Sequence, residues 1–452
     1  MAFTDLNFLS RFLPLFLIIY FLLPRRMQQP ALFTGSLIFY AMGDWRHLPL
    51  LLLLCWLNFV FAKMVWEDKS DNGRHRRQIL LAIAGMDAGV LVLFKIMSVA
   101  LGMALPLGIS FYIFKMLSFQ ADLYQGKITQ KPSMFTMAAY FSLFFQVAQG
   151  PIMRYTEEEY AKPHRLSLIK IEEGLKYLII GLAMKVLVAD RLAILWHEAV
   201  KIGFESLSTP LAWLAAAGYS LELYLDFWGY SLMAAGIGVM LGFSFVENFR
   251  HPYAATSVGE FYRRWHITLT SWFKDYVYIP LGGSRKGKKR TIVNILLVWL
   301  LTGFWHGGGL HFILWGLVLG GLILWEKFIG IKWLRKYPAV GHMYVIVLIP
   351  LTWMCFAVGN MSELSALFSR LLPLSGQTAG ADPNDFVRYL SRFWTYICAG
   401  IALCVPKVYE FVQQKRDGKA RLVEAAILVL LLWISLYSAN SSKANPFMYL
   451  YF

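Results

Sequence analysis

Charged residues are scarce in this sequence of 452 residues. Lysine, arginine, aspartate and glutamate together make up 15% of the chain, whereas a soluble domain contains about 25% of such residues. Hydrophobic residues make up 58%, and the mean hydropathy is +0.52. This balance excludes an ordinary soluble protein. It indicates a polytopic membrane protein whose core is mostly helix packed against helix.

Cysteine is also rare, and no cleavage site follows the first apolar run. The four cysteines lie in apolar stretches without the spacing of a metal site, so they are interpreted as small core residues and no metal is predicted: Cys55, Cys355, Cys398 and Cys404. The first apolar run, Phe8–Leu23, is followed by Pro24-Arg25-Arg26 and by no small-residue cleavage site. We therefore expect a retained first helix. The sequence has no internal repeat, coiled coil or attached soluble enzyme domain.

Acidic residues are outnumbered, since 43 lysines and arginines face 27 aspartates and glutamates and the net charge is +16. The cations fall in short clusters between apolar runs, the pattern of cytoplasmic loops that face anionic lipid. The clusters are Arg25–Arg26, Lys63–Arg77, Lys286–Arg290 and Lys415–Arg421. No RNA-binding or zinc-knuckle signature accompanies them. Membrane lipids are therefore the expected partners of this charge, and nucleic acid is not. Both chain ends and the linker Gly43–His47 are expected outside.

Apolar runs of spanning or near-spanning length recur along the whole chain. They lie at Phe8–Leu23, Ala31–Met42, Leu48–Val65, Ile79–Lys95, Ala104–Phe119, Phe135–Val147, Leu175–Val188, Leu211–Phe227, Met233–Phe245, Ile292–Phe304, Phe312–Trp325, Val345–Val358, Phe393–Val405 and Val423–Tyr437. Several are too short to cross a bilayer alone, so some are expected to be re-entrant or buried among neighbours. The predicted fold class is an all-α polytopic integral membrane protein. It forms one domain over residues 1–452, with a core motif region at 101–330.

Polar side chains stand in several of these runs. Lys115 shares a helix face with Ser118 and either lines a cavity or snorkels toward a helix end; for Lys115 alone the second interpretation is preferred slightly. Gln146, Gln149 and Arg154 surround a Gly-Pro break, as in an interrupted or re-entrant helix.

Two carboxylates, Glu222 and Asp226, are four residues apart and share one helix face. They form a metal or proton site, or each pairs with a cation elsewhere. Pairing with an arginine is favoured, because a buried charge must be compensated. The candidate arginines are Arg154, Arg191, Arg263 and Arg264.

The stretch Glu260–Trp315 contains two tryptophan–histidine pairs, Trp265-His266 and Trp305-His306, each beside apolar sequence. Ionisable groups at membrane depth are expensive and usually face a protein-lined cavity. A packing histidine that bonds to a neighbouring helix is the alternative. Two such pairs with a polar cluster between them favour a functional site.

At this point the chain resembles the membrane-bound O-acyltransferase family, and specifically its bacterial branch that serves alginate O-acetylation and related cell-surface acylations. The landmarks run in the family's order over nearly the whole length. They are Leu105–Asp122, Phe144–Tyr155, Gly181–Arg191, Tyr219–Gly242, Glu247–Tyr253, Glu260–Lys286, Phe304–Gly316 and Asn445–Tyr449. The combination RRWHI, SWFKDYVYIPLGG and FWHG is highly specific to the family.

The resemblance implies a ring of transmembrane and re-entrant helices around a central tunnel. It also implies that His306, in the WHG element, is catalytic and that His266, in the RWH element, is a second functional position nearer the cytoplasmic mouth. The positions expected to bind substrate are Arg264, Trp265, Ser271, Asp275, Tyr278, Trp305, Asp226 and Asn248.

The chain also departs from the family pattern. After WHG it has Gly308-Gly309-Leu310 in place of Ala-Asn-Trp, and it has an extra histidine, His311. A histidine usual in the family is absent at Val318–Gly320, and a usual arginine is absent in the element that begins at Trp353. Either His311 substitutes for the absent histidine, or it packs.

The expected reaction is transfer of an acyl group, with acetyl as the first candidate. A cytoplasmic thioester donor, acetyl-CoA or an acyl carrier, is expected to enter near His266 and Arg264, with no bound cofactor. His306, with its pKa lowered by burial, would be neutral and act as a general base; a covalent acyl-enzyme is a further option. The resemblance implies an extracytoplasmic acetyltransferase partner of the SGNH type.

The final acceptor would then be a polysaccharide such as alginate or cellulose, and the location would be the inner or plasma membrane. Three alternatives stay open at this point. A sister branch transfers D-alanine from a carrier protein to teichoic acid. A transporter or export channel would use the midplane charges to bind its substrate. A purely structural scaffold is the weakest option, because it would bury many polar groups to no purpose.

Overall fold

The computed structural model describes residues 3–68, 73–147, 150–160, 164–372, 380–413 and 417–441. These residues form helices and loops without any β-strand, and 81% of the structure is helical. The predicted all-α class is confirmed. Gln149, part of the basic cluster Lys415–Arg421 and the closing motif Asn445–Tyr449 lie outside the described residues.

The chain forms two compact units, and α9 and α11 belong to both. The first unit contains residues 1–180, 230–247 and 439–452, and the second contains residues 181–229 and 248–438. The single domain expected over residues 1–452 stays a prediction.

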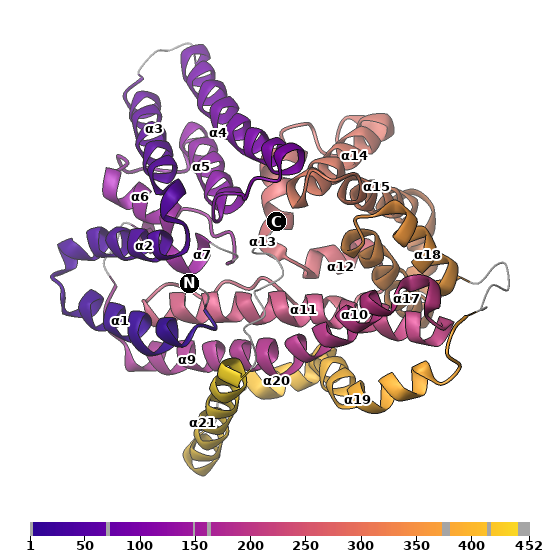
Figure 1. Cartoon of the computed structure of the whole chain (residues 1–452). Coiled ribbons are helices and arrows are strands. Elements are labelled where there is room, and N and C mark those ends of the chain that lie inside the picture. Colours follow the sequence, from indigo (N-terminus) through magenta and orange to yellow (C-terminus); the bar gives the residue numbers. More distant parts are fainter. Residues whose placement is uncertain are drawn as a thin grey trace. The chain divides into compact units, whose positions relative to one another are not determined.

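The first unit is built from the N-terminal helices (Figure 1). They are α1 (Leu13–Leu22, preceded by a π-helical turn Phe8–Phe12), α2 (Gln28–Asp44), α3 (Leu48–Glu67), α4 (Arg74–Leu101), α5 (Ile109–Tyr124), α6 (Met134–Ser142), α7 (Phe144–Val147), α8 (Glu157–Tyr160), most of α9 (Leu168–Ala183) and the end of α11 (Thr209–Met240).

The second unit contains the end of α9, the rest of α11 and the helices given below, of which α21 extends by its last three residues into the first unit. They are the π-helical turn Met184–Ala189, α10 (Asp190–Ile202), α12 (Val258–Arg264), α13 (Ile267–Phe273) followed by the π-helical turn Lys274–Tyr278, α14 (Gly287–His306), α15 (Leu310–Trp325) followed by Glu326–Gly330, α16 (Ile331–Lys336), α17 (Pro338–Ala357), α18 (Met361–Leu371), α19 (Asp385–Cys404), α20 (Pro406–Gln413) and α21 (Gly418–Ser441).

Five helical segments among the described residues are long and apolar enough to cross a membrane. They are Arg25–Glu67, Arg74–Leu101, Leu310–Lys336, Pro338–Ala357 and Gly418–Asn440. The chain is therefore a multi-pass membrane protein, as its composition predicts. The other helices are shorter or more polar, and several of them carry the buried polar groups described below.

Three local predictions meet different outcomes. The two apolar runs Leu211–Phe227 and Met233–Phe245 are wrong as separate elements, because the single helix α11 runs through Thr209–Met240. The interruption predicted in Phe144–Tyr155 is confirmed, since α7 ends at Val147 and residues 150–156 are not helical.

The preference for a snorkelling Lys115 is also wrong. This side chain is 1% exposed, and its Nζ donates to the Tyr140 carbonyl at 2.8 Å. A backbone carbonyl inside the first unit, rather than water at a helix end, solvates the ammonium group.

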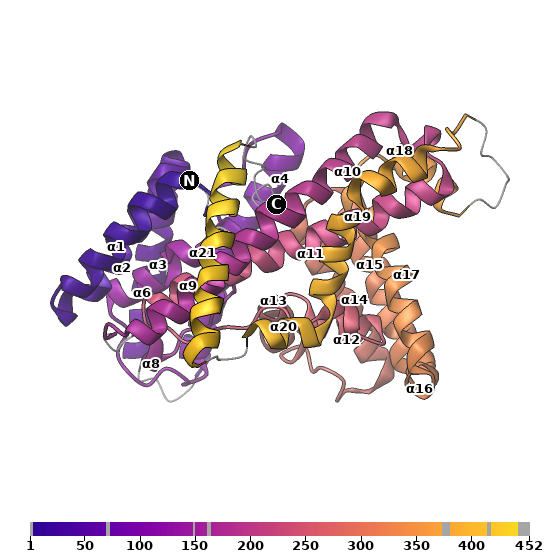
Figure 2. The same ribbon diagram turned by 90° about the horizontal axis from the view of Figure 1, so that it is seen from below.

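The second unit places α14 and α15 against each other with their backbones in close approach. A Cβ at Gly303 would come within 2.5 Å of the Phe312 carbonyl oxygen, and a Cβ at Gly316 would clash with the Trp299 carbonyl oxygen. Membrane helices use small residues in this way because lipid provides no hydrophobic drive for their association. Figure 1 shows the two helices side by side, and α15 also lies beside α17 in Figures 1 and 2. The pair of helices places the end of α14, and with it His306, inside the unit.

Glu326 anchors α12 from the end of α15. Its buried carboxylate accepts hydrogen bonds from the backbone N–H groups of Val258 and, at 2.8 Å, Gly259. These groups begin α12 and have no partner within the helix, so a carboxylate there satisfies them and complements the helix dipole. The short helix that leads to Trp265-His266 is thereby tied to α15.

Candidate active site

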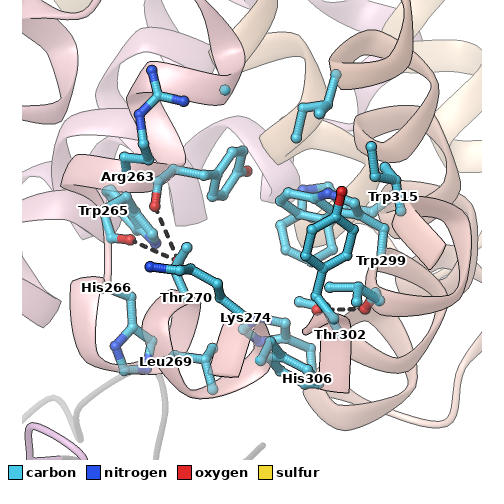
Figure 3. A pocket seen from close by; sticks show the side chains of 17 residues that line it. Arg263, Trp265, His266, Leu269, Thr270, Lys274, Trp299, Thr302, His306 and Trp315 are labelled. Atoms are coloured by element: carbon cyan, nitrogen blue, oxygen red, sulfur yellow. Dashed lines mark hydrogen bonds between the residues drawn. The ribbon is translucent and has the colours of Figure 1, made fainter. Parts of the chain in front are cut away.

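A cavity of about 220 Å³ lies inside the second unit, between α12, α13, α14 and α15. Both histidines of the predicted site, His266 and His306, line it, together with Trp265 and Tyr278 (Figure 3). These four predicted positions come from segments up to 41 residues apart in the chain. The folded structure brings them to one enclosed space.

His306 is the last residue of α14 and is 4% exposed. Three aromatic rings surround its imidazole at nearly perpendicular angles. The ring centroids lie 4.7 Å away for Trp305, 5.0 Å for Trp315 and 5.3 Å for Phe356. Each such edge-to-face pair contributes about 0.5–1.5 kcal/mol. The cage therefore holds the imidazole in one orientation at the cavity.

His266 precedes α13 and is 2% exposed. Its Nδ1 lies 3.0 Å from Oδ1 of Asn248, and its ring packs against Phe227 with centroids 4.7 Å apart. This histidine lies outside the candidate membrane spans. Burial lowers its pKa to about 3, because the apolar surroundings disfavour the charged imidazolium. His266 is therefore neutral near pH 7.

The ring of Trp305 stands near both imidazoles. Its centroid is 6.4 Å from that of His266 and 4.7 Å from that of His306. Trp305 does not line the cavity, although it was expected to bind substrate. Its place behind the two histidines indicates that it sets their spacing.

Two cationic side chains of the cavity were missed by sequence reasoning. Arg263 and Lys274 line it (Figure 3), whereas the expected Arg264 does not. Arg264 pairs instead with Glu260 at 2.6 Å. Two adjacent arginines on a seven-residue helix leave no periodicity from which to decide which of them faces inward.

The Glu260 carboxylate pairs with Arg264 and also accepts hydrogen bonds from Thr256, just before α12. Its Oε2 accepts from the N–H of Thr256 at 2.9 Å and from its hydroxyl at 3.0 Å. Burial alone would raise the pKa of Glu260, but the Thr256 hydrogen bonds and the Arg264 cation leave this pKa below its ordinary value. Arg264 is thus committed to an ion pair at the surface of the unit.

Other cavity residues do carry a sequence signal. Counting back from His306 by four and seven residues gives Thr302 and Trp299, both of which line the cavity. This is the spacing of one face of a helix. Trp315, from α15, completes the aromatic wall and was not predicted.

The remaining predicted substrate positions lie elsewhere in the second unit. The Ser271 hydroxyl donates to the Thr268 carbonyl at 2.9 Å within the turn, and Asp275 lies 4.0 Å from the Lys274 ammonium; neither lines the cavity. Asn248 contacts Nδ1 of His266 and does not itself line the cavity. His311 packs on the ring of Phe312, with centroids 4.0 Å apart, and does not line the cavity.

Asp226 belongs to a separate buried cluster. Its carboxylate lies 2.6 Å from the Lys185 ammonium, which also contacts Asp190 at 2.7 Å. Ion pairing, favoured over a metal or proton site, is confirmed for Asp226. The predicted arginine partner is wrong, because the cation is a lysine from the π-helical turn after α9. In the part of the chain that the structure describes, no three histidine, cysteine or acidic side chains are grouped to hold a metal.

A cavity lined by two buried imidazoles, in a multi-pass helical protein, is what the resemblance to an integral-membrane acyltransferase family leads one to expect. The model of the membrane-bound O-acyltransferase family matches residues 36–368. The chain belongs to this family and is an O-acyltransferase.

Three proteins similar to this chain are named for different acceptors. A protein of Pseudomonas putida named as a probable alginate O-acetylase is 30% identical, with full coverage of both chains. The peptidoglycan O-acetyltransferase of Helicobacter pylori is 30% identical over 85% of this chain and 82% of its own. The teichoic acid D-alanyltransferase of Bacillus subtilis is 31% identical over 51% of this chain and 61% of its own.

Proposed function

We propose that this protein takes an acetyl group from cytoplasmic acetyl-CoA and delivers it across the membrane for O-acetylation of a cell-surface or extracellular polysaccharide. The observation that supports this most is the cavity shared by His266 and His306. Relatives named for acetylation of alginate and of peptidoglycan match most of both chains, which supports acetyl over other acyl groups.

The proposed chemistry is general-base catalysis at His306. The acceptor hydroxyl loses its proton to the imidazole while its oxygen attacks the thioester carbonyl carbon. A C–O bond forms, the C–S bond breaks, and the thiolate leaves with the proton from the imidazolium. A base must lie within hydrogen-bond reach of the proton it removes, and His306 lines a cavity that could hold the reacting groups.

The cations Arg263 and Lys274 line the same cavity and would hold the anionic part of the donor there. An arginine is suited to this task because its planar guanidinium binds two phosphate oxygens at once. Acetyl-CoA acts as a substrate, and no resident cofactor is required.

The acceptor side of the proposal includes a partner. The acetyl group passes to an extracytoplasmic transferase of the SGNH type, which esterifies the polysaccharide. The membrane is the inner or plasma membrane. The runner-up function is transfer of D-alanine from a carrier protein, which is favoured by the 31% identity to a teichoic acid D-alanyltransferase over 51% of this chain.

The test is acetyl-CoA consumption by purified protein in nanodiscs, with and without a candidate partner transferase. We expect His306→Ala to reduce the rate by about 10²–10⁴-fold, the usual contribution of a positioned base. His342→Ala is the matched control, because His342 contacts the Ala255 carbonyl at 3.1 Å and does not line the cavity. It should retain most of the activity.

Each outcome of this assay decides between functions. Turnover of a D-alanyl carrier protein with no consumption of acetyl-CoA would support the runner-up function, D-alanyl transfer, instead of the proposed one. Equal rates for the wild type and a folded His306→Ala variant would refute general-base catalysis by this residue.

A further inference from the structure

One residue, Asn248, is hydrogen-bonded to three consecutive residues, His266, Ile267 and Thr268. Its Oδ1 lies 3.0 Å from His266 Nδ1, 2.8 Å from the Thr268 hydroxyl and 3.3 Å from the Thr268 backbone nitrogen. Its backbone carbonyl accepts from the Ile267 N–H at 2.9 Å. Asn248, His266 and Thr268 are all buried. The asparagine therefore clamps the junction between α12 and α13.

These contacts decide which atom of the Asn248 amide faces His266. The backbone N–H of Thr268 can only donate a hydrogen bond, so the amide atom beside it must be the oxygen. The same oxygen faces His266 Nδ1, and an oxygen without a hydrogen can only accept. His266 Nδ1 must therefore carry the proton. In a neutral imidazole the other nitrogen, Nε2, then has the free lone pair.

The Nε2 atom is buried and has no hydrogen-bond partner among the described residues. A buried polar atom without a partner is destabilising, and such atoms call for an explanation. The residue His266 lines the cavity, whereas Nε2 itself is covered, so a bound molecule reaches this acceptor by packing against the imidazole.

The backbone of His266 adds a second unusual feature. Its φ is 44°, in the left-handed region that non-glycine residues rarely adopt. Such a conformation is unfavourable for a residue with a side chain and persists only where the surroundings enforce it. The hydrogen bonds that Ile267 and Thr268, the two following residues, donate to Asn248 provide that enforcement. His266 thus combines a strained backbone, a hydrogen bond to Asn248 and a buried acceptor atom, Nε2, without a partner.

We propose that Asn248 is a positioning residue for acyl transfer, which holds His266 in the Nδ1–H tautomer so that Nε2 accepts a hydrogen bond from an N–H or O–H group of the bound substrate. The role in transfer rests on the proposed function; the tautomer does not. The cations Arg263 and Lys274 and the phenol of Tyr278 line the same cavity as His266 and His306. The low pKa of His266 is consistent with a group that accepts and never donates through Nε2.

The tautomer is measured directly by nitrogen NMR of full-length protein in nanodiscs with ¹⁵N-labelled histidine. The His266 signals are identified by their loss in His266→Gln. We expect a protonated Nδ1 and an unprotonated Nε2 in the wild type. The Nε2–H tautomer would overturn the proposal by itself.

Two substitutions of Asn248 separate positioning from structural support. Asn248→Asp keeps the accepting oxygen and adds a negative charge beside Nδ1, which favours the imidazolium. It should keep the tautomer and move the acid limb of the rate–pH profile to higher pH. Asn248→Ala removes the acceptor, so both tautomers become accessible, and kcat should fall by about 10–100-fold.

Asn294→Ala is the matched control. Asn294 is another buried asparagine of this unit, whose Nδ2 donates to the Gly283 carbonyl at 2.9 Å and which does not line the cavity. It should lower thermal stability without changing the His266 signals or the pH profile. Equal losses in Asn248→Asp and Asn248→Ala, with an unshifted profile, would reduce Asn248 to a structural role. If the wild type consumes no acyl thioester, the proposed function fails, while the NMR signals still decide the tautomer.

Discussion

Lys185 pairs with two carboxylates, the buried Asp226 and the half-buried Asp190. Its ammonium contacts Asp190 and Asp226, while Glu222 lies one helical turn before Asp226 and is also buried. Arg191 is a second cation near Asp190, whereas Lys185 is the cation that lies 2.6 Å from Asp226. Taking a charge out of water costs several kcal/mol, which the attraction of a close partner offsets only if that partner is present. The cluster therefore depends on one lysine.

We expect Lys185→Met to destabilise the protein by about 3–5 kcal/mol, the usual effect of leaving a buried charge without its partner. The midpoint of thermal unfolding should fall by about 5 °C or more. Lys185→Met combined with Asp226→Asn should recover part of the loss. Lys201→Met, at an exposed position of α10, is the control. A midpoint unchanged by Lys185→Met would mean that the carboxylates are already neutral.

Helix packing decides where His306 lies. α14 and α15 approach through Gly303 and Gly316, at positions where a side chain would meet the backbone of the other helix. His306 lies three residues after Gly303, and Trp315 lies one residue before Gly316. A change in the distance between these helices therefore moves the base and the wall of its aromatic cage together.

We expect Gly303→Ala to push the two helices apart and to cost about 1–3 kcal/mol of stability, as overpacking does. Acyl transfer should fall along with stability, because His306 moves with α14. Gly321→Ala, in α15, is the control, since a Cβ there meets nothing within 4 Å and alanine favours a helix. The measurement compares thermal midpoints and rates for the two variants. Equal behaviour would show that the helices tolerate the wider spacing.

The stability of the whole molecule should depend on pH through His266. Its pKa is about 3 in the folded protein, against an ordinary value of 6.5. Between these values the unfolded chain binds a proton that the folded chain does not, so stability rises with pH. The contribution is fully present above pH 6.5 and is lost as the pH falls toward 3.

We therefore expect the thermal midpoint of the wild type to decrease from pH 7.5 to pH 5.5. The slope is up to about 1.4 kcal/mol per pH unit for this one group. His266→Gln lacks the titrating imidazole and should show a shallower dependence over the same range. Parallel curves for the two proteins would assign the acid sensitivity to other groups. A shallower curve for His266→Gln would mean that the pH dependence of stability reports on the same histidine as the pH dependence of activity.

The sequence by itself determined the class of this protein and pointed to the two histidines proposed for its chemistry. Composition and apolar runs sufficed for a helical multi-pass protein, because hydrophobic length is a local property. The sequence motifs identified the family and singled out both histidines. The spacing of four and seven residues before His306 indicated Thr302 and Trp299 as residues on the same helix face. Only the tertiary structure decided which neighbours these residues have. It brought Arg263 rather than Arg264 to the cavity, paired Asp226 with Lys185 rather than with an arginine, and turned Asn248 toward His266. Each of these choices depends on contacts between segments far apart in the chain, and no local pattern encodes them.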